Sequence, residues 1–348
     1  SLVEKNIYNK NILITGAGGS VGSELSRIIA ENSPKKIVLL DKSEYNLYQI
    51  YNEINSKILK TNIQLVPILL SILEYDQLFD IINENNIQII FHAAAYKHVD
   101  IVQNNKFYCL KNNILGTFNC IQASIKNKVE NFVLISTDKA VRPKNIMGSS
   151  KRFAELMILY YSKNQEKKNS TNFCAVRFGN VVGSSGSVIP LFEKQIKEGG
   201  PVTVTDKKAK RYFMSINEAA ELVIQSSSIS LNGEIFVLDM GEPVSIDYVA
   251  KKMIQQRNES YVKNQILKKE IKIIYTGLRP GEKLEEELFL DNKKISTVHP
   301  KIYKVDEHIT RIDDEFDKNI NELIKYIDQK NDDKVNDVLS KSIESLKE

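Results

Sequence analysis

The sequence lacks the features that define several protein classes. It has only three cysteines in 348 residues, namely Cys109, Cys120 and Cys174. Their odd number and wide spacing match neither a disulfide framework nor a metal-binding pattern, so we expect buried free thiols, a reducing compartment and no bound metal. The net charge is only +4, which is too small a surplus to indicate a nucleic-acid partner.

Long apolar runs are also missing. The longest, residues 65–73, is interrupted by Pro67 and Ser71 and is too short to span a bilayer, and no signal peptide is present. We therefore expect no membrane segment in this chain and a cytoplasmic location. The chain begins at Ser1 rather than Met, which leaves open a longer, membrane-anchored protein with this chain as its cytoplasmic part.

The sequence does contain a regular alternation of strand-like and helical patterns. Such alternation favours an α/β fold with a parallel sheet covered on both faces. We expect a Rossmann-like, doubly wound parallel sheet with a smaller C-terminal substrate lobe. The expected strands cover residues 11–15, 36–40, 63–68, 87–93, 132–136, 173–178 and 235–238, and a helix is expected at 22–32.

Three regions are expected along the chain. Residues 1–180 form a dinucleotide-binding domain, to which the later strand at 233–241 returns. Residues 181–312 form the substrate-binding lobe. Its first part is rich in Gly, Ser and Pro, which is typical of a binding loop. Residues 313–348 are charged and amphipathic, and they predict surface helices.

A glycine-rich turn follows the first expected strand, with Gly16, Gly19 and Gly22 three residues apart. Such a turn before a helix lets a pyrophosphate approach the helix N-terminus. Asp41 ends the second strand, where a carboxylate binds the ribose hydroxyls and repels a 2′-phosphate, so NAD is predicted rather than NADP. The predicted cofactor-binding residues are Gly16, Gly18, Gly19, Ser20, Val21, Gly22, Asp41, Ser43, Ser71, Ile72, Ala93, Ala94, Ala95 and Lys151.

Titratable residues follow two of the expected strands. Asp138 and Lys139 come directly after the fifth strand, where α/β proteins bind ligands. Lys97 follows the fourth strand in the same way, and we expect it near a ligand. His92 lies inside that strand without acid, Cys or His partners nearby, so we expect a structural role for it.

Four strings of sequence together resemble one family. Residues 93–99, 136–143, 177–181 and 279–283 are similar to those of bacterial nucleotide-sugar 4,6-dehydratases of polysaccharide biosynthesis. These are extended short-chain dehydrogenase/reductases, and the resemblance covers about residues 10–290. In most such enzymes a catalytic tyrosine stands four residues before a lysine, and here Met147 stands four residues before Lys151. A thioether cannot accept a proton, so the resemblance is to the subgroup with Met at this position.

The resemblance implies an NAD-dependent dehydration of UDP-N-acetylglucosamine that retains the carbon 5 configuration, carried out by a homo-oligomer. Lys139 would be the base for carbon 5 and would need a lowered pKa, while Asp138 would be the acid for the carbon 6 hydroxyl and would need a raised one. If the two neighbours are ionised together, they would instead stabilise each other's charge as a coupled pair. Thr137 would bind the carbon 4 hydroxyl, Lys151 the nicotinamide ribose, and Met147 would pack against the sugar or ring. The acceptor of the carbon 4 proton stays open, with Asp138 preferred, directly or through Thr137 or water.

The same resemblance places further side chains around the substrate. Arginine suits a diphosphate because its planar fork matches the phosphate oxygens, and Glu282 is expected at the nucleotide ribose. The predicted substrate-binding residues are Lys97, His98, Asn180, Ser187, Val188, Arg211, Arg279 and Glu282.

Two other functions remain possible from the sequence. A nucleotide-sugar 4-epimerase would need a tyrosine-like base, which Met147 cannot supply. A non-catalytic NAD-binding protein would have no use for the adjacent Asp138 and Lys139, whose burial costs stability when they are unpaired. The nucleotide, which could also be GDP or dTDP, and the sugar are likewise open.

Overall fold

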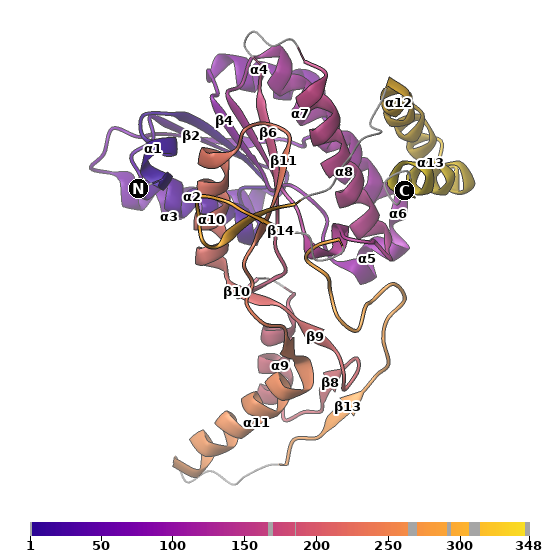
Figure 1. Ribbon diagram of the computed structural model, residues 1–348. Helices are drawn as coiled ribbons and strands as arrows, with labels where there is room; N and C mark the ends of the chain where they lie inside the picture. Colours follow the sequence, from indigo (N-terminus) through magenta and orange to yellow (C-terminus); the bar gives the residue numbers. More distant parts are fainter. Residues whose placement is uncertain are drawn as a thin grey trace.

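The computed structural model describes residues 2–165, 170–184, 186–263, 270–290, 294–305 and 314–344. These residues form a large α/β unit and a smaller lobe below it (Figure 1). Nine of the described strands make one sheet. Their order is β14 (Lys294–Ser296), β15 (Ile302–Val305), β11 (Glu234–Leu238), β6 (Asn172–Arg177), β5 (Asn131–Ile135), β4 (Ile89–His92), β1 (Asn11–Thr15), β2 (Lys36–Asp41) and β3 (Gln64–Leu69).

The strands from β3 to β11 run parallel, and chain order reverses between the neighbours β1 and β4. The predicted strands agree with the observed ones to within two residues at each end. The central strands are almost wholly apolar because helices cover both faces of the sheet. The doubly wound parallel sheet is therefore confirmed, and its order reversal opens a crevice at the carboxyl ends of the strands.

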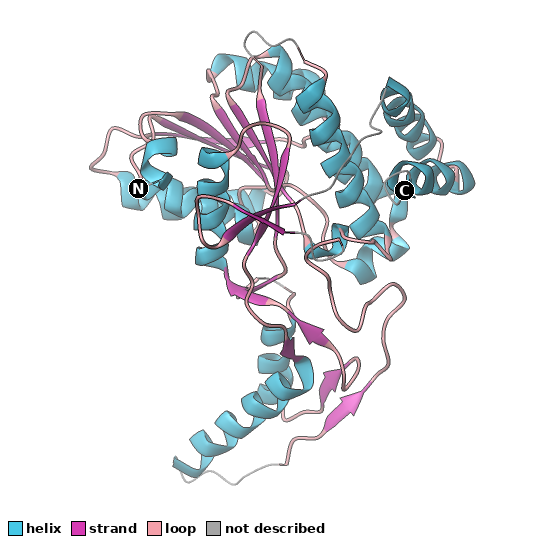
Figure 2. Ribbon diagram, viewed as in Figure 1, coloured by secondary structure: helices cyan, strands magenta, loops and turns pink. Residues whose placement is uncertain are grey.

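Two layers of helices cover the sheet (Figure 2). Each layer shares its own buried apolar cluster with one face of the strands. The first layer contains α4 (Tyr75–Glu84), α7 (Gly116–Lys126) and α8 (Ile146–Lys163). The second contains α1 (Leu2–Ile7), α2 (Ser20–Glu31), α3 (Glu44–Ile58) and α10 (Ile216–Ile229).

The C-terminal helices α12 (Asp314–Asp328) and α13 (Asp332–Glu344) continue the first layer. Ile320, Leu323 and Ile327 are buried in the same cluster as α8, so these amphipathic helices have one apolar side packed and one polar side exposed. They lie beside the short helical run of α5 (Val99–Asn104), α6 (Lys106–Leu110) and the π-helix η1 (Lys111–Leu115). No helix in the described ranges has both the length and the apolar character needed to cross a membrane.

The smaller lobe has a core of its own, around Phe192, Ile196 and Val202. The region expected to form this lobe, residues 181–312, is not spatially continuous, because α10, β11, β14 and β15 pack on the large unit. The returning strand expected at 233–241 is β11, whereas local sequence patterns gave no sign of the antiparallel pair β14 and β15. The remaining elements are β7 (Asn180–Val182), α9 (Val188–Lys197), β8 (Val202–Val204), β9 (Lys210–Arg211), β10 (Phe213–Ser215), β12 (Val244–Ser245), α11 (Ile246–Lys263) and β13 (Ile273–Tyr275).

Candidate active site

A cavity of about 540 Å³ lies between the carboxyl ends of the parallel strands and the smaller lobe. The segments after β1, β4, β5 and β6 line one side, and Arg211 of β9 and the loop 279–286 contribute to the other. Most of the predicted site residues meet here. The predicted residues in its lining are Gly19, Ser20, Val21, Gly22, Ala93, Ala95, Lys97, His98, Thr137, Lys139, Met147, Lys151, Asn180, Ser187, Val188, Arg211, Arg279 and Glu282.

A second group of predicted residues lies outside this lining. Asp138 is buried directly behind the lining residue Lys139. Ile72 is buried against Gly116, away from the cavity lining. The assignment of this group to cofactor or catalysis therefore stays a prediction. Its members are Gly16, Gly18, Asp41, Ser43, Ser71, Ile72, Ala94 and Asp138.

The glycine turn between β1 and α2 has the geometry of an anion cradle. Gly16 has φ +67°, and a Cβ there would lie 2.7 Å from the Ala94 backbone. A Cβ on Gly22 would lie 2.0 Å from the Gly16 carbonyl oxygen, so only glycine allows this approach of helix to strand. Gly19, the N-cap of α2, gives no side-chain hydrogen bond to the first turn. The helix N-terminus can therefore bind a phosphate with its own N–H groups.

Asp41 is held firmly at the end of β2. Its Oδ2 accepts a hydrogen bond from the Gly18 backbone N–H and its Oδ1 one from the Ser43 N–H, both at 2.9 Å. A carboxylate oxygen has a further lone pair, so each oxygen can still accept from a ligand hydroxyl. The glycine turn and Asp41 together fit the pyrophosphate and ribose of a dinucleotide.

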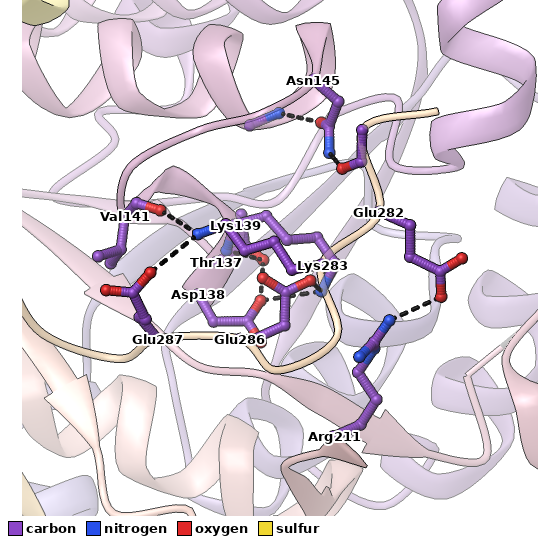
Figure 3. A network of polar contacts seen from close by, with 12 residues as sticks. Thr137, Asp138, Lys139, Val141, Asn145, Arg211, Glu282, Lys283, Glu286 and Glu287 are labelled. Carbon is purple, nitrogen blue, oxygen red and sulfur yellow. Dashed lines mark hydrogen bonds and ion pairs between the residues drawn. The ribbon is translucent and has the colours of Figure 1, made fainter. Parts of the chain in front are cut away.

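The acid–base residues are clustered after β5, in the 3₁₀ turn η2 (Asp138–Ala140) (Figure 3). The Thr137 hydroxyl donates to Asp138 Oδ1 at 2.9 Å, and Lys139 Nζ donates to the same oxygen at 3.0 Å. Lys139 Nζ also lies 3.7 Å from Glu286 Oε1. Among the described residues, neither Asp138 Oδ2 nor Glu286 Oε2 has a hydrogen-bond partner, although both atoms are buried. The three groups thus form one cluster with spare acceptor capacity, in which Lys139 and Glu286 line the cavity and Asp138 lies behind them.

The charges in this cluster contradict one expectation from the sequence. Burial alone would lower the pKa of Lys139, but the negative charges of Asp138 and Glu286 outweigh it, and the pKa is raised. Burial raises the pKa of Glu286, Asp138 adds to that rise, and Lys139 opposes it. The pKa of Lys139 is therefore raised rather than lowered, which agrees with the alternative of an ionised Asp138–Lys139 pair, and Glu286 adds to the rise.

Helix α8 places Met147 and Lys151 on the cavity wall. Asn145 caps the helix, its Oδ1 accepting from the Gly148 N–H at 2.9 Å. Lys151 Nζ donates to the Ile135 carbonyl at 2.9 Å, and burial lowers the pKa of Lys151 to about 8. Met147 is buried in a small apolar cluster that includes Cys109. Position 147 therefore offers an apolar surface to the cavity, beside a lysine held in place.

A loop that we call the strap, residues 279–287, closes the cavity on the side of the smaller lobe. Lys283 Nζ donates to the Val141 carbonyl at 2.8 Å, and Asn145 Nδ2 donates to the Gly281 carbonyl at 3.0 Å (Figure 3). Gly281 has φ +76°, and a Cβ there would lie 2.8 Å from Asn145 Cβ. These contacts hold the strap against the turn that carries Lys139.

Both arginines predicted to bind a diphosphate are paired with acids. Arg211 Nη2 lies 2.6 Å from Glu282 Oε1, and Arg279 forms an ion pair with Asp100. Glu282 Oε2 also accepts a hydrogen bond from the Arg279 backbone N–H at 3.2 Å. The Glu282 carboxylate thus contacts both the Arg211 side chain and the Arg279 backbone, and the sequence gave no indication of this arrangement.

Sequence reasoning missed Glu286, Asp100 and Asn145 in the cavity wall. Asp100 and Asn145 gave no signal at all, and Glu286 stands in a run of three glutamates without a pattern to single it out. The structural role expected for His92 is confirmed. The ring is fully buried and bonded to Thr15 and Thr117 at 2.7 and 2.9 Å, and burial lowers its pKa to about 3. The three cysteines are buried free thiols, as expected.

The sheet order, the glycine turn and the cavity at the strand ends define a Rossmann-like α/β protein. The model of the polysaccharide biosynthesis protein family matches residues 12–307, and the chain belongs to this family. The X-ray structure of Pen from Bacillus thuringiensis superposes with a TM-score of 0.76 at 36% identity, covering 86% of this chain and 88% of that one.

Curated relatives differ in the activities their names state. The chain is 44% identical to the capsular polysaccharide biosynthesis protein CapD of Staphylococcus aureus over 90% of its own length and 51% of that protein. It is 30% identical to a UDP-N-acetylglucosamine 4,6-dehydratase (inverting) of Campylobacter jejuni over 90% and 88%. A UDP-glucose 4-epimerase of Rickettsia canadensis is 34% identical over 80% and 77%. The chain spans about half the length of the first of these relatives.

Proposed function

We propose that this chain is a 4,6-dehydratase that converts UDP-N-acetylglucosamine to UDP-2-acetamido-2,6-dideoxy-4-hexulose, for surface polysaccharide or glycoprotein glycan synthesis. The observation that carries the proposal is the pair of Lys139 on the cavity wall and the buried Asp138 directly behind it, with Met147 in place of a tyrosine in the same wall. An acid and a base within 3.0 Å of each other suit an elimination, whereas a simple redox step needs only one of them.

The cofactor we propose is NAD. Bound at the glycine turn and Asp41, it would supply the reversible removal of a hydride from sugar carbon 4 and its return at carbon 6. Asp41, hydrogen-bonded to Gly18 and Ser43, favours ribose hydroxyls over a 2′-phosphate. Lys151, anchored at the Ile135 carbonyl, lies where it can hold the nicotinamide ribose.

The sugar chemistry falls to the residues of the turn η2. Asp138, joined to the Thr137 hydroxyl, takes the proton of the carbon 4 hydroxyl. The ketone at carbon 4 acidifies the carbon 5 proton, and Lys139 removes it. Asp138 then gives its proton to the carbon 6 hydroxyl, which leaves as water. Lys139 returns its proton to carbon 5 as carbon 6 is reduced, so no net oxidation occurs.

Retention at carbon 5 is part of the proposal. Met147 cannot exchange a proton, so in this proposal Lys139 both takes the carbon 5 proton and returns it to the same face. The two arginines of the cavity wall support a diphosphate substrate, with Lys97, His98 and Asn180 near the sugar. A homo-oligomer stays a prediction that the mass of the protein in solution would test.

The test is proton NMR of the purified protein with UDP-N-acetylglucosamine in deuterated water. We expect a new carbon 6 methyl signal, deuterium at carbon 5, and ring couplings that report retention. A carbon 4 epimer without a methyl signal would instead make the chain an epimerase, the activity named for its Rickettsia relative. An unchanged spectrum with UDP-, GDP- and dTDP-sugars would overturn the proposal.

A further inference from the structure

Glu286 is a buried carboxylate of the strap that faces the cavity beside Lys139. Its side chain is 4% exposed, and its Oε1 lies 3.7 Å from Lys139 Nζ. Its Oε2 is buried without a hydrogen-bond partner among the described residues, which costs free energy. The neighbouring glutamates differ, because Glu285 is half exposed near Lys210 and Glu287 pairs with Arg142. The position of Glu286 is therefore not explained by a role in holding the strap.

The cluster holds more negative than positive charge. Asp138 and Glu286 both face the single ammonium of Lys139. Arg211 and Lys283 also act on Glu286 electrostatically, but each is engaged elsewhere, Arg211 with Glu282 and Lys283 with the Val141 carbonyl. With all three groups ionised the cluster has a net charge of −1, so it can take up one proton at little cost.

The proposed reaction needs two proton acceptors before carbon 5 can react. Lys139 must lose a proton to become a neutral base, and the carbon 4 hydroxyl must lose another. Asp138 is the closer carboxylate to Lys139, at 3.0 Å, but it cannot take both protons. If it neutralised Lys139, it could no longer accept the carbon 4 proton and pass it to carbon 6.

We propose that Glu286 takes the proton of Lys139 when substrate fills the cavity, so that Lys139 enters the reaction as a neutral amine. One N–H bond breaks at Nζ and one O–H bond forms at Oε1, with no change in total charge. Exclusion of water favours this neutral pair over the ion pair. The distance of 3.7 Å is longer than a hydrogen bond, and we expect it to shorten in the complex. Glu286 acts through Lys139 and keeps its proton through the cycle.

The test compares Glu286→Gln with Glu285→Gln, a matched change one residue away. The inference rests on the proposed function. The rate of product formation is therefore measured as a function of pH with ordinary and with carbon 5-deuterated UDP-N-acetylglucosamine. In Glu286→Gln, Asp138 still holds Lys139 charged, so we expect turnover about 100-fold lower near neutral pH. The turnover of this variant should recover about tenfold per pH unit at alkaline pH, because Lys139 then loses its proton to solvent instead of to Glu286. The carbon 5 isotope effect should grow, because proton removal becomes limiting.

Three comparisons decide the outcome. Glu285→Gln should match the unchanged protein, and Glu286→Asp should restore part of the activity. A Glu286→Gln protein with an unchanged pH profile and isotope effect would overturn the inference, as would an equal loss at every pH, which indicates a structural role. If no nucleotide sugar reacts even with the unchanged protein, the proposed function fails. NMR of labelled lysines with UDP-N-acetylglucosamine present then decides, because Lys139 must be neutral in the unchanged protein and in Glu285→Gln but charged in Glu286→Gln, and a charged Lys139 in all three would sink the inference.

Discussion

Two clusters of polar and charged side chains lie beside the end of β5, and they differ in how completely their carboxylates are hydrogen-bonded. Ser136 belongs to one cluster, and Asp138 and Lys139 belong to the other. In the closed cluster, Glu155 Oε1 accepts from Ser136 at 2.6 Å and from Arg177 Nε at 2.7 Å. Its Oε2 accepts from Arg177 at 2.7 Å and from Arg152 at 3.0 Å. In the open cluster around Lys139, Asp138 and Glu286 each keep a buried oxygen without a partner in the described part of the chain.

The difference indicates that the closed cluster contributes to the stability of the fold and the open cluster to the proposed reaction. A buried carboxylate whose lone pairs all meet donors recovers much of its desolvation cost, and its removal takes a counter-charge from the buried arginines beside it. The Arg177 and Arg152 charges, together with hydrogen bonds, outweigh burial and lower the pKa of Glu155. The open cluster has surplus acceptors, whose burial without hydrogen bonds costs free energy but suits the proposed proton transfer.

The largest expected effect is the loss of activity in Lys139→Ala. Removal of the base that takes the carbon 5 proton should lower product formation by about 10³-fold or more, a barrier increase of about 4 kcal/mol. The measurement is the rate of methyl-signal formation by NMR, with bound nucleotide and circular dichroism as checks on folding. Lys144→Ala, at an exposed position of the same loop, is the control. Undiminished turnover in Lys139→Ala would remove Lys139 from the mechanism.

The closed cluster should respond in the opposite way, through stability. Glu155→Gln removes the carboxylate charge that the buried side chains of Arg152 and Arg177 share, and we expect a loss of about 3–5 kcal/mol in the free energy of unfolding. Urea unfolding measures it.

Two controls sharpen this contrast. Glu53→Gln breaks the partly exposed pair with Arg27 and should change stability by about 1 kcal/mol or less. Glu286→Gln removes one of two like charges beside Lys139 and should leave stability unchanged or higher. A Glu286→Gln protein as unstable as Glu155→Gln would mean that the two clusters do not differ in kind.

The same contrast explains how much could be predicted from the sequence. The parallel strands, the glycine turn and Asp41 are local features, because apolar runs and glycine spacing act within a few residues, and the seven parallel strands were predicted to within two residues at each end. Lys139 was recognisable next to Asp138, but Glu286 lies 147 positions further along the chain, and only folding brings it to 3.7 Å. The contribution of Glu286 to the raised pKa of Lys139 was therefore not predictable, whereas that of Asp138 was.

Lys151 gives a smaller effect that depends on pH. Its pKa is about 8 in the folded protein against 10.5 for the free side chain, because burial disfavours the ammonium. Between these two pH values the unfolded chain binds a proton that the folded chain has lost, so stability should rise with pH, by about 3 kcal/mol across the window. Below pH 8 both states are protonated and this contribution is constant. In urea unfolding without nucleotide, Lys151→Met should lack the rise, and parallel curves would show that Lys151 is not the group responsible.

The smallest effect concerns the exposed ion pair between Asp100 and Arg279 of the strap. Asp100 and Arg279 have side chains that are 52% and 54% exposed, so their ion pair contributes at most about 1 kcal/mol. A diphosphate that binds Arg279 must displace Asp100, whereas Arg211 is nearly buried against Glu282. Asp100→Asn should therefore tighten binding of UDP by up to about 5-fold in calorimetry, and added salt should shrink the difference. Weaker binding in Asp100→Asn would mean that Asp100 itself contacts the nucleotide, and Arg279 would then lose its place as the diphosphate ligand.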